Sequence, residues 1–425
     1  MIEFVQKYSK SYGDIFFVNT LKEEMVIINH PDYAKHIFQD NNKNYIKSFA
    51  YQVLRLFLGN GLLTSEGDFW LRQRRLAQPA FHRERLQKLT ESMIESTDKF
   101  VDKMNENAKN GAEFNMAHEL NGLTLDIVSK ALFSSDISES MEKVRTSMDI
   151  ANDFAFKKIF EIVPKPMWVP TTLHQEFKKA NSNLEGIINK VVESRRKNPG
   201  QYHDLLAMLM ETKDEDTGET MNDRQLRDEA MTIFLAGHET TAVALSWFYY
   251  VMTTRRDIEE KIRKEVSEVC GDSPVAVQHL PQLKYTRMVI DELLRLFPPA
   301  WIIGRKALTD DVIGGYRITK DSNVLVLPFQ IHRLPEFWEN PNEFIPERFT
   351  PEKVKEMHKF AYFPFGGGPR QCIGNNFALM EMQVIIASTL RNFSFERTTT
   401  EDPEMEQLVT LRMKNGIKMK AVANA

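Results

Sequence analysis

Apolar and polar residues alternate along most of the chain with the period of an α-helix. Apolar positions three and four residues apart predict one long helix, 223–253, and further helices over 68–88, 90–106, 115–134, 138–157, 172–197, 203–211, 256–270 and 284–297. The segment His30-Pro31-Asp32 predicts the start of a short helix that continues through Phe38. Helix therefore dominates, and we expect a mainly α fold with a minor β region.

Short apolar segments bounded by turn residues predict that β region. Strands are expected over 15–18, 25–28, 312–318 and 323–327, and a terminal hairpin over 408–421 around Asn415-Gly416. The β-rich portions are then about 12–30, 300–330 and 408–421. No repeat or low-complexity linker divides the chain, so we expect a single domain over residues 1–425.

Composition narrows the class of protein. With 425 residues, 42% of them hydrophobic, the chain has enough apolar material for a large core, and its net charge of -4 argues against a dedicated nucleic-acid binder. Two cysteines provide no disulfide framework, and the N-terminus shows no secretory signal. The longest apolar stretch, 233–252, contains Glu239, which is costly in lipid. We therefore expect a cytoplasmic protein with no membrane segment in this chain.

The most informative segment for chemistry is 363–374, with the sequence FPFGGGPRQCIG. Its three glycines permit close approach of a flat or bulky group. The residues after Gly374 predict a helix, so Cys372 lies at a helix N-terminus, where partial positive charge favours a thiolate. Such a thiolate suits a metal or an electrophile.

Four interpretations of this thiol can be compared. A phosphate loop is disfavoured because Pro369 removes an N–H donor and no Lys-Ser/Thr pair follows. Zinc needs several ligands, and the only other cysteine, Cys270, is far upstream. A haem iron needs a single thiolate, which fits the cysteine count. A nucleophilic cysteine with a histidine base stays open, and it predicts a colourless protein that is alkylated at Cys372.

The spacing of Phe365, Gly368, Arg370, Cys372 and Gly374 resembles the haem loop of the cytochrome P450 family. The resemblance implies that Cys372 is the axial ligand of haem b. It also implies the fold of that family, in which the haem lies between a long central helix and the cysteine-bearing loop and helix.

The long predicted helix contains the sequence AGHETT over 236–241. Ala236 and Gly237 leave room beside the backbone, and the Thr240 hydroxyl can bond the carbonyl four residues earlier. The motif resembles the distal oxygen groove of the family, with Glu239 and Thr240 as the acid and alcohol that support proton delivery. Close packing by small residues is the alternative.

Two further groups of residues match the family by position. Glu292, Arg295 and Arg348 resemble its buried Glu-Arg-Arg cluster and receive a structural role. Haem propionates need donors or positive charge, and the residues that resemble the family's propionate-binding positions are Trp70, Arg74, Arg305 and Arg370. Arg72 or Arg75 replaces Arg74 if the helix phase differs. Three histidines are conceivable second ligands, although a surface or hydrogen-bonded role is favoured for each: His82, His238 and His332.

The resemblance implies a haem-thiolate monooxygenase that inserts one oxygen atom of O2 into a C–H bond of a small organic substrate. Hydroxylation and O-dealkylation, including demethylation, are equally available. Electrons would come from NAD(P)H through a reductase and a ferredoxin or flavodoxin-type donor, for which the basic helix 70–88 is a docking face. The alternatives are a peroxide-driven peroxygenase and a non-enzymatic haem sensor or electron carrier.

Candidate walls of a substrate pocket are apolar and lie in several parts of the chain. They are 49–63, 154–168, Phe234, 300–303 and 408–410. The identity of the substrate does not follow from them. Because family members usually carry a few dozen residues before the Tyr12-Gly13-Asp14 segment, we expect that a leader or anchor can precede residue 1.

Overall fold

The computed structural model describes residues 1–424 except 20–23, 135–137, 162, 164, 199 and 203. The chain forms two compact units. Unit 1 contains residues 1–48, 97–120 and 240–425, and unit 2 contains residues 49–96 and 121–239. Three helices pass from one range into the other: α5 (Arg83–Asn110), α6 (Met116–Phe133) and α10 (Asp223–Thr254).

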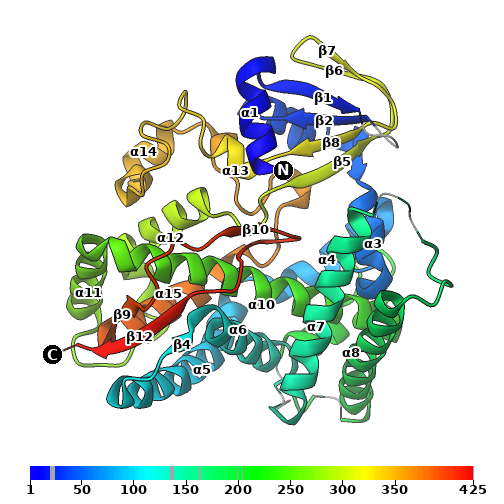
Figure 1. Ribbon diagram of the computed structural model, residues 1–425. Helices are drawn as coiled ribbons and strands as arrows, with labels where there is room; N and C mark the ends of the chain where they lie inside the picture. Colours follow the sequence, from blue (N-terminus) through cyan, green and yellow to red (C-terminus); the bar gives the residue numbers. More distant parts are fainter. Residues whose placement is uncertain are drawn as a thin grey trace. The chain divides into compact units, whose positions relative to one another are not determined.

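Unit 1 contains a five-stranded sheet with the order β1-β2-β8-β5-β3 (Figure 1). Its strands are β1 (Ile15–Asn19), β2 (Glu24–Ile28), β8 (Asn323–Val326), β5 (Ile303–Ala307) and β3 (Tyr45–Lys47). β2 and β8 are parallel, with Ile28 opposite Val326, and the other pairs are antiparallel. Helix α1 (Ile2–Tyr12) packs its Val5 against this sheet, beside Phe16 and Leu327.

Unit 1 also contains the second half of α10 and a set of further helices. They are α2 (Pro31–Lys35), α11 (Arg256–Cys270), α12 (Lys284–Leu296), α13 (Pro328–Ile331), α14 (Pro351–Glu356) and α15 (Asn375–Asn392). α10 and α15 are joined by a buried hydrogen bond of 2.6 Å between the Tyr249 and Thr389 hydroxyls. Trp247 of α10 donates to the Leu411 carbonyl at 2.9 Å, which ties the C-terminal segment to the same helix.

The C-terminal hairpin expected over 408–421 is wrong. Asn415 and Gly416 do form a turn with positive φ, but the segments on either side pair elsewhere. β11 (Leu411–Met413) pairs with β10 (Met405–Gln407), and β12 (Lys418–Ala423) lies between β4 (Phe114–Asn115) and β9 (Phe393–Arg397). Long-range pairing has overridden a local turn signal because β12 buries Met419 and Ala421 in the other sheet.

Unit 2 is helical in its described residues. It contains α3 (Phe49–Leu58), α4 (Gly67–Ala77), α7 (Ser138–Ile159), α8 (Thr172–Lys197), α9 (Leu205–Glu211) and the first half of α10. Helices α7 and α8 pack along one another, and the Phe154 and Phe177 rings stack with centroids 3.9 Å apart. Phe154 is fully buried, so it is a core residue of this helix pair.

Two predicted elements are interrupted. The basic helix expected over 68–88 is wrong as a continuous element, because α4 ends at Ala77, a 3-10 turn covers Gln78–Phe81, and α5 begins at Arg83. Pro79 has no N–H to continue the hydrogen-bond ladder. The strand expected over 312–318 is two strands, β6 (Asp311–Ile313) and β7 (Tyr316–Ile318), joined at Gly314-Gly315. The short helix after His30 continues as a π-helical turn, His36–Asp40.

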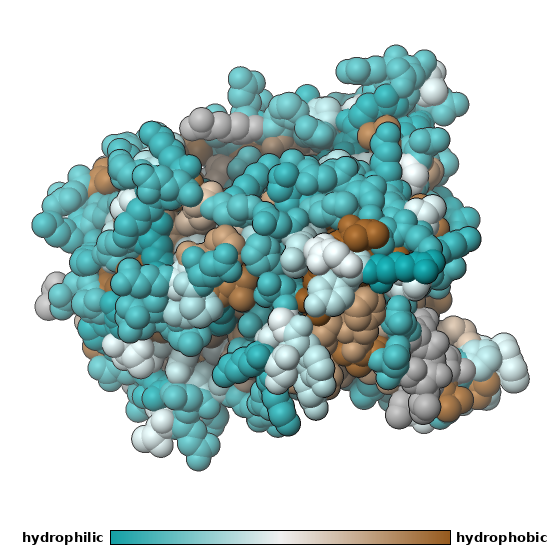
Figure 2. Space-filling view, turned by 90° about the horizontal axis from the view of Figure 1, so that it is seen from above, coloured by the Kyte–Doolittle hydropathy of each residue, from teal (hydrophilic) through white to brown (hydrophobic). Residues whose placement is uncertain are grey.

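The long apolar stretch of the sequence is the buried central part of α10. Among the described helices, none is both long and apolar enough to cross a membrane. Figure 2 shows a face on which hydrophilic side chains predominate, with hydrophobic residues in smaller areas between them.

Candidate functional site

Cys372 lies in unit 1 in the turn before α15, and it is exposed. Its backbone N–H donates to the Phe365 carbonyl at 2.9 Å, which closes the loop from Phe365 to Cys372. Gly374 caps the N-terminus of α15 without a side-chain hydrogen bond. The partial positive charge at this helix end is therefore directed at the turn that carries the thiol.

The glycines of this loop allow very close packing. Gly368 has φ +66°, and a Cβ added to it would lie 1.8 Å from the Phe38 carbonyl oxygen. A Cβ on Gly367 would lie 2.5 Å from the Phe360 ring. The loop is thus held against two segments of unit 1 by backbone contacts that a larger residue would prevent.

Arg305 is the buried cation near this loop. It lies on β5, where a Cβ added to Gly366 of the loop would lie 3.9 Å from Ile303, and its side chain stacks on Phe38 with the guanidinium 5.1 Å from the ring centroid. Arg305 is only 6% exposed, and its hydrogen bond is to the Gly304 carbonyl at 2.9 Å. Among the described residues no carboxylate pairs with it. A buried guanidinium of this kind can pair with an anionic group from outside the chain.

Glu292, Arg295 and Arg348 are in contact in unit 1. Arg295 makes a bidentate pair with Glu292 at 2.7 and 2.8 Å, and Arg348 donates to the same carboxylate at 3.3 Å. Arg295 also donates to the carbonyls of His332, Pro341 and Glu343. Glu292 accepts the Ile345 N–H at 2.8 Å. The cluster therefore connects α12 to the coil that precedes the cysteine loop.

His332 belongs to the same support. The Phe363 N–H donates to its Nε2 at 3.0 Å, and its Nδ1 lies 3.3 Å from the Arg295 carbonyl oxygen. Burial, with the Arg295 charge as a further cause, lowers the pKa of His332 to about 3. Both ring nitrogens are engaged, so this histidine braces the chain before the loop and does not present a metal ligand.

α10 has one open stripe in an otherwise buried section. Ala236 is exposed, and Ile233, Gly237 and Thr240 are partly exposed, whereas the residues between them are buried. The spacing i, i+3, i+4, i+7 places these four on one helix face. Small side chains line an open face of α10 at the positions where the sequence predicts room for a cofactor.

Glu239 and His238 lie on other faces of α10. Glu239 is 9% exposed, and the Asn152 amide of α7 donates to its Oε2 at 2.6 Å within unit 2. His238 is buried with Nδ1 3.1 Å from the Phe234 carbonyl oxygen, and burial lowers its pKa. His238 is therefore neutral and turned away from the open stripe.

α4 carries Trp70 and Arg74 in unit 2, and both are partly exposed. The neighbouring arginines are committed to an acidic turn. Arg75 pairs with Asp214 at 2.9 Å and with Asp216 at 2.5 Å, and Arg72 pairs with Glu219 at 3.2 Å. Arg72 and Arg75 are thus both held by the acidic turn 214–219.

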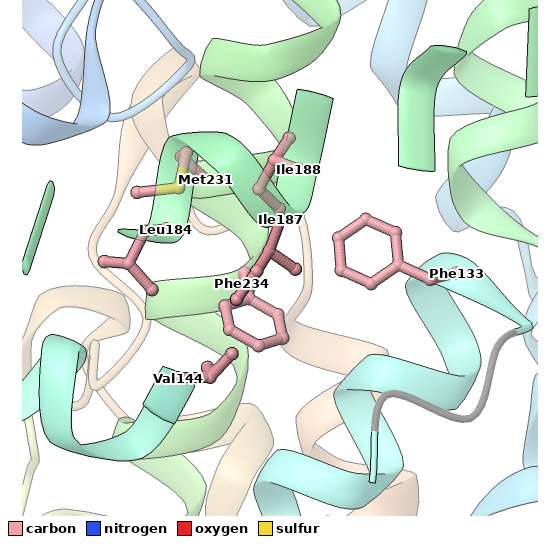
Figure 3. A pocket seen from close by; sticks show the side chains of 7 residues that line it. All are labelled: Phe133, Val144, Leu184, Ile187, Ile188, Met231 and Phe234. Atoms are coloured by element: carbon pink, nitrogen blue, oxygen red, sulfur yellow. The ribbon is translucent and has the colours of Figure 1, made fainter. Parts of the chain in front are cut away.

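A small apolar cavity lies in unit 2 on the face of α10 that carries Phe234 (Figure 3). Its volume is about 10 Å³, counted as space open to the centre of a water molecule, which is the lower limit for one water. Phe234 lines it with Phe133 and Met231 and is 2% exposed. Phe234 and Phe154 are therefore buried in the core of unit 2.

The residues of unit 1 fit an iron porphyrin. One exposed thiol at a helix start can ligate iron, and Arg305 offers a buried cation for which no carboxylate partner is described. Porphyrin propionates are anions of the kind that such a cation binds.

Sequence patterns did not reveal three contributors to these sites. They are Phe38, which contacts both Arg305 and Gly368; Asn152, which binds Glu239; and Glu381. Glu381 is fully buried on α15, nine residues after Cys372, and burial raises its pKa well above the ordinary value. A carboxyl within an apolar helical pattern was the one available signal. Cys270 is the buried last residue of α11, at the end of the predicted helix 256–270.

A family model described as Cytochrome P450 matches residues 1–421. The chain is 32% identical to Protein LUTEIN DEFICIENT 5, chloroplastic, of Arabidopsis thaliana, over 96% of this chain and 72% of that protein. It is 30% identical to Cytokinin hydroxylase of the same plant, over 97% of this chain and 81% of the relative. The solved heme domain of cytochrome P450DA has the same fold, with a TM-score of 0.92 and 24% identity, and the alignment covers 100% of this chain and 93% of that one.

Proposed function

The chain belongs to the cytochrome P450 family, and from this premise we propose that it inserts one oxygen atom of O2 into a C–H bond of a small organic molecule with Cys372 as the axial iron ligand. The observation that supports this proposal most directly is the exposed Cys372 thiol next to the start of α15, where no side chain caps the helix. The chain is a monooxygenase that uses haem iron as its cofactor and O2 as its co-substrate. The residue that binds the iron, the class of substrate and the source of electrons are proposals.

When bound, haem supplies the oxidising power, and the thiolate ligand favours cleavage of the O–O bond. The residues of the chain would hold and orient the reagents. Arg305, Arg370, Trp70 and Arg74 are proposed to bind the propionates, and Phe365, Gly368 and Gly374 to shape the loop around the ligand. Ala236 and Gly237 are proposed to border the cofactor and oxygen from the open stripe of α10; a Cβ on Gly237 would lie 2.9 Å from Val128 Cγ2, so this glycine also permits close packing.

Glu239 and Thr240 are proposed as the proton-handling residues. The carboxylate of Glu239 is held by the amide of Asn152, and Thr240 lies on the open stripe of α10. A fixed acid next to an accessible hydroxyl can hold a proton close to the reacting oxygen without exposing the site to bulk water. Glu292, Arg295 and Arg348 would act structurally, by fixing the coil that leads to the cysteine loop.

The ligand is tested by the carbon monoxide difference spectrum of the reduced protein. We expect the red-shifted Soret band of thiolate ligation in the wild-type protein and in Cys270→Ala, because Cys270 is buried at the end of α11. Cys372→Ala should lose the band. Survival of the band in Cys372→Ala, or its absence from the wild-type protein, would overturn the assignment. A colourless wild-type protein that is alkylated at Cys372 would favour the nucleophilic cysteine instead.

Hydroxylation and O-dealkylation, including O-demethylation, are both proposed as reactions of this site. The name of the relative Cytokinin hydroxylase supports the first.

We further propose that the two units function as one catalytic domain, which the family match over residues 1–421 supports. A cytoplasmic location is proposed from the cysteine content.

Electrons are proposed to come from NAD(P)H through a reductase and a ferredoxin or flavodoxin-type donor. The docking face expected on a continuous helix 70–88 needs revision for two reasons. The segment is broken at Pro79, and two of its arginines, Arg72 and Arg75, bind the acidic turn.

A peroxide-driven peroxygenase is the second candidate function. The Glu239–Thr240 pair favours the O2-dependent reaction, since peroxide already carries the protons that this pair would deliver.

A further inference from the structure

The loop 59–66 in unit 2 joins α3 to α4 and lies against the first half of α10. Two consecutive carboxyl groups of α10 accept its backbone N–H groups. Asp228 accepts the Asn60 N–H at 2.7 Å, and Glu229 accepts the Leu62 N–H at 3.0 Å. Each of these backbone N–H groups therefore donates to a carboxyl group of α10, and not to a neighbouring strand or a water molecule.

The approach is close enough to require glycine at two positions of the loop. Gly59 has φ +65°, and a Cβ added to it would lie 2.1 Å from Asp228 Oδ1. A Cβ on Gly61 would lie 2.2 Å from Thr232 Oγ1 and 2.6 Å from the Asp228 carbonyl oxygen. The backbone of the loop therefore rests directly on the helix.

Internal hydrogen bonds make the loop one unit. The Thr64 hydroxyl donates to the Gly59 carbonyl at 2.7 Å, and Arg55 of α3 donates to the Thr64 carbonyl. Thr64 and Ser65 are fully buried. A contact that fixes Asn60 and Leu62 therefore fixes the whole loop, together with the end of α3 and the start of α4.

Glu229 is the unusual member of the pair. It is fully buried, and its Oε1 has no hydrogen-bond partner among the described residues. Burial, opposed by the Leu62 hydrogen bond and assisted by the Asp228 charge, raises its pKa to about 8. The other charged groups around the contact are Arg227, which pairs with Asp228 at 2.8 Å; Glu185 of α8, which pairs with Arg227; and Arg55.

We propose that Asp228 and Glu229 are positioning residues that hold the loop 59–66 against α10. By holding this loop they fix the positions of α3 and of α4, the helix that carries Trp70 and Arg74. The consequence for substrate rests on the proposed function, because it requires that these elements border the substrate and the cofactor. The positioning itself requires only unit 2.

Protonation of Glu229 is linked to docking of the loop. When the loop is docked, Glu229 has a pKa of about 8; when the loop lifts, water reaches the carboxyl and its pKa returns toward about 4.3. The docked state therefore holds a proton that the open state releases between these values. The opening equilibrium should rise by up to about tenfold per pH unit from about pH 5 to pH 8 and level off above pH 8.

Hydrogen exchange of the Leu62 amide in the haem-loaded protein tests this proposal. After correction for intrinsic exchange, the wild-type protection factor should fall with rising pH over that window. Glu229→Gln keeps an oxygen acceptor without a titrating proton, so its protection factor should be independent of pH. Glu229→Ala removes the acceptor and should lower protection at pH 6 by about tenfold.

Glu185→Gln is the matched control, because Glu185 pairs with Arg227, as Asp228 does, but accepts no described hydrogen bond from the loop. It should follow the wild-type pH profile. Equal profiles for the wild-type protein and Glu229→Gln would refute the role of the Glu229 proton, and unchanged protection in Glu229→Ala would refute the positioning. If Glu229→Ala does not fold, the pH profiles of Leu62 protection in the wild-type protein and in Glu229→Gln still test the proposal. Because amide exchange does not depend on turnover, the result stands even if the carbon monoxide test fails.

Discussion

At the scale of single residues, the molecule places titratable groups where their protonation is decided by burial. Glu381 of α15 is fully buried, neither of its carboxyl oxygens makes a hydrogen bond among the described residues, and the Thr241 hydroxyl is the polar group that faces it. Burial raises its pKa well above the ordinary value, so the folded protein holds a proton here that the unfolded chain releases. His332 shows the opposite effect, because burial removes its proton.

The Glu381 proton predicts a stability profile. Since its pKa is raised in the folded state, the free energy of unfolding should fall as the pH rises from the ordinary value of glutamate, by up to about 1.4 kcal/mol per pH unit. Glu381→Gln should remove this contribution. Denaturant unfolding at pH 5, 6 and 7 measures the slope, with Glu352→Gln on the exposed face of α14 as the control. An equal slope in Glu381→Gln and the wild-type protein would contradict the prediction.

At the scale of elements, short segments far apart in sequence are fitted to one another through glycine. The cysteine loop is held against the π-helical turn His36–Asp40 by Gly368, and Phe38 of that turn also stacks on Arg305. The position of the thiol is thus coupled to the position of the buried cation. The loop 59–66 is fitted to α10 in the same way.

Gly368→Ala should therefore destabilise the protein and weaken haem retention. The new methyl would overlap the Phe38 carbonyl, and the backbone has positive φ, so we expect a loss of about 3 kcal/mol. Gly366→Ala is the matched control, since Gly366 has φ +73° in the same loop but would only contact Ile303 at 3.9 Å. Thermal unfolding and the haem content of the purified variants measure the effect. Equal losses in the two variants would show that backbone strain, and not the clash, is responsible.

At the scale of the whole molecule, residues 1–425 contain no flavin or iron–sulfur signature, and the proposed function therefore takes the electrons for O2 reduction from a ferredoxin or flavodoxin-type donor. We expect that the purified chain with NADPH alone shows no substrate oxidation and that a ferredoxin with its reductase restores it. Product formation per NADPH consumed is the measurement. Oxidation supported by peroxide alone at the same rate would favour the peroxygenase.

The local pattern of the sequence determined the helical class, the bounds of α8, α11 and α12, and the position of the thiol before a helix. These features depend on contacts three or four residues apart, which periodicity records directly. The motif around Cys372 pointed to the family that the match over residues 1–421 shows. The helical periodicity on either side of Pro79 masks the break that this proline causes between α4 and α5.

Only the tertiary structure decided which distant groups meet. The pairing of β12 with β9 instead of β11, the contact of Asn152 with Glu239 and the seat of the loop 59–66 on Asp228 and Glu229 join residues that are separated by at least 20 positions. Their partners are set by burial and by the satisfaction of backbone donors across the fold, and neither leaves a periodic signal. Arg305 is a further example. The sequence alone does not show whether this arginine is exposed, whereas in the fold it is buried and no carboxylate is described as its partner.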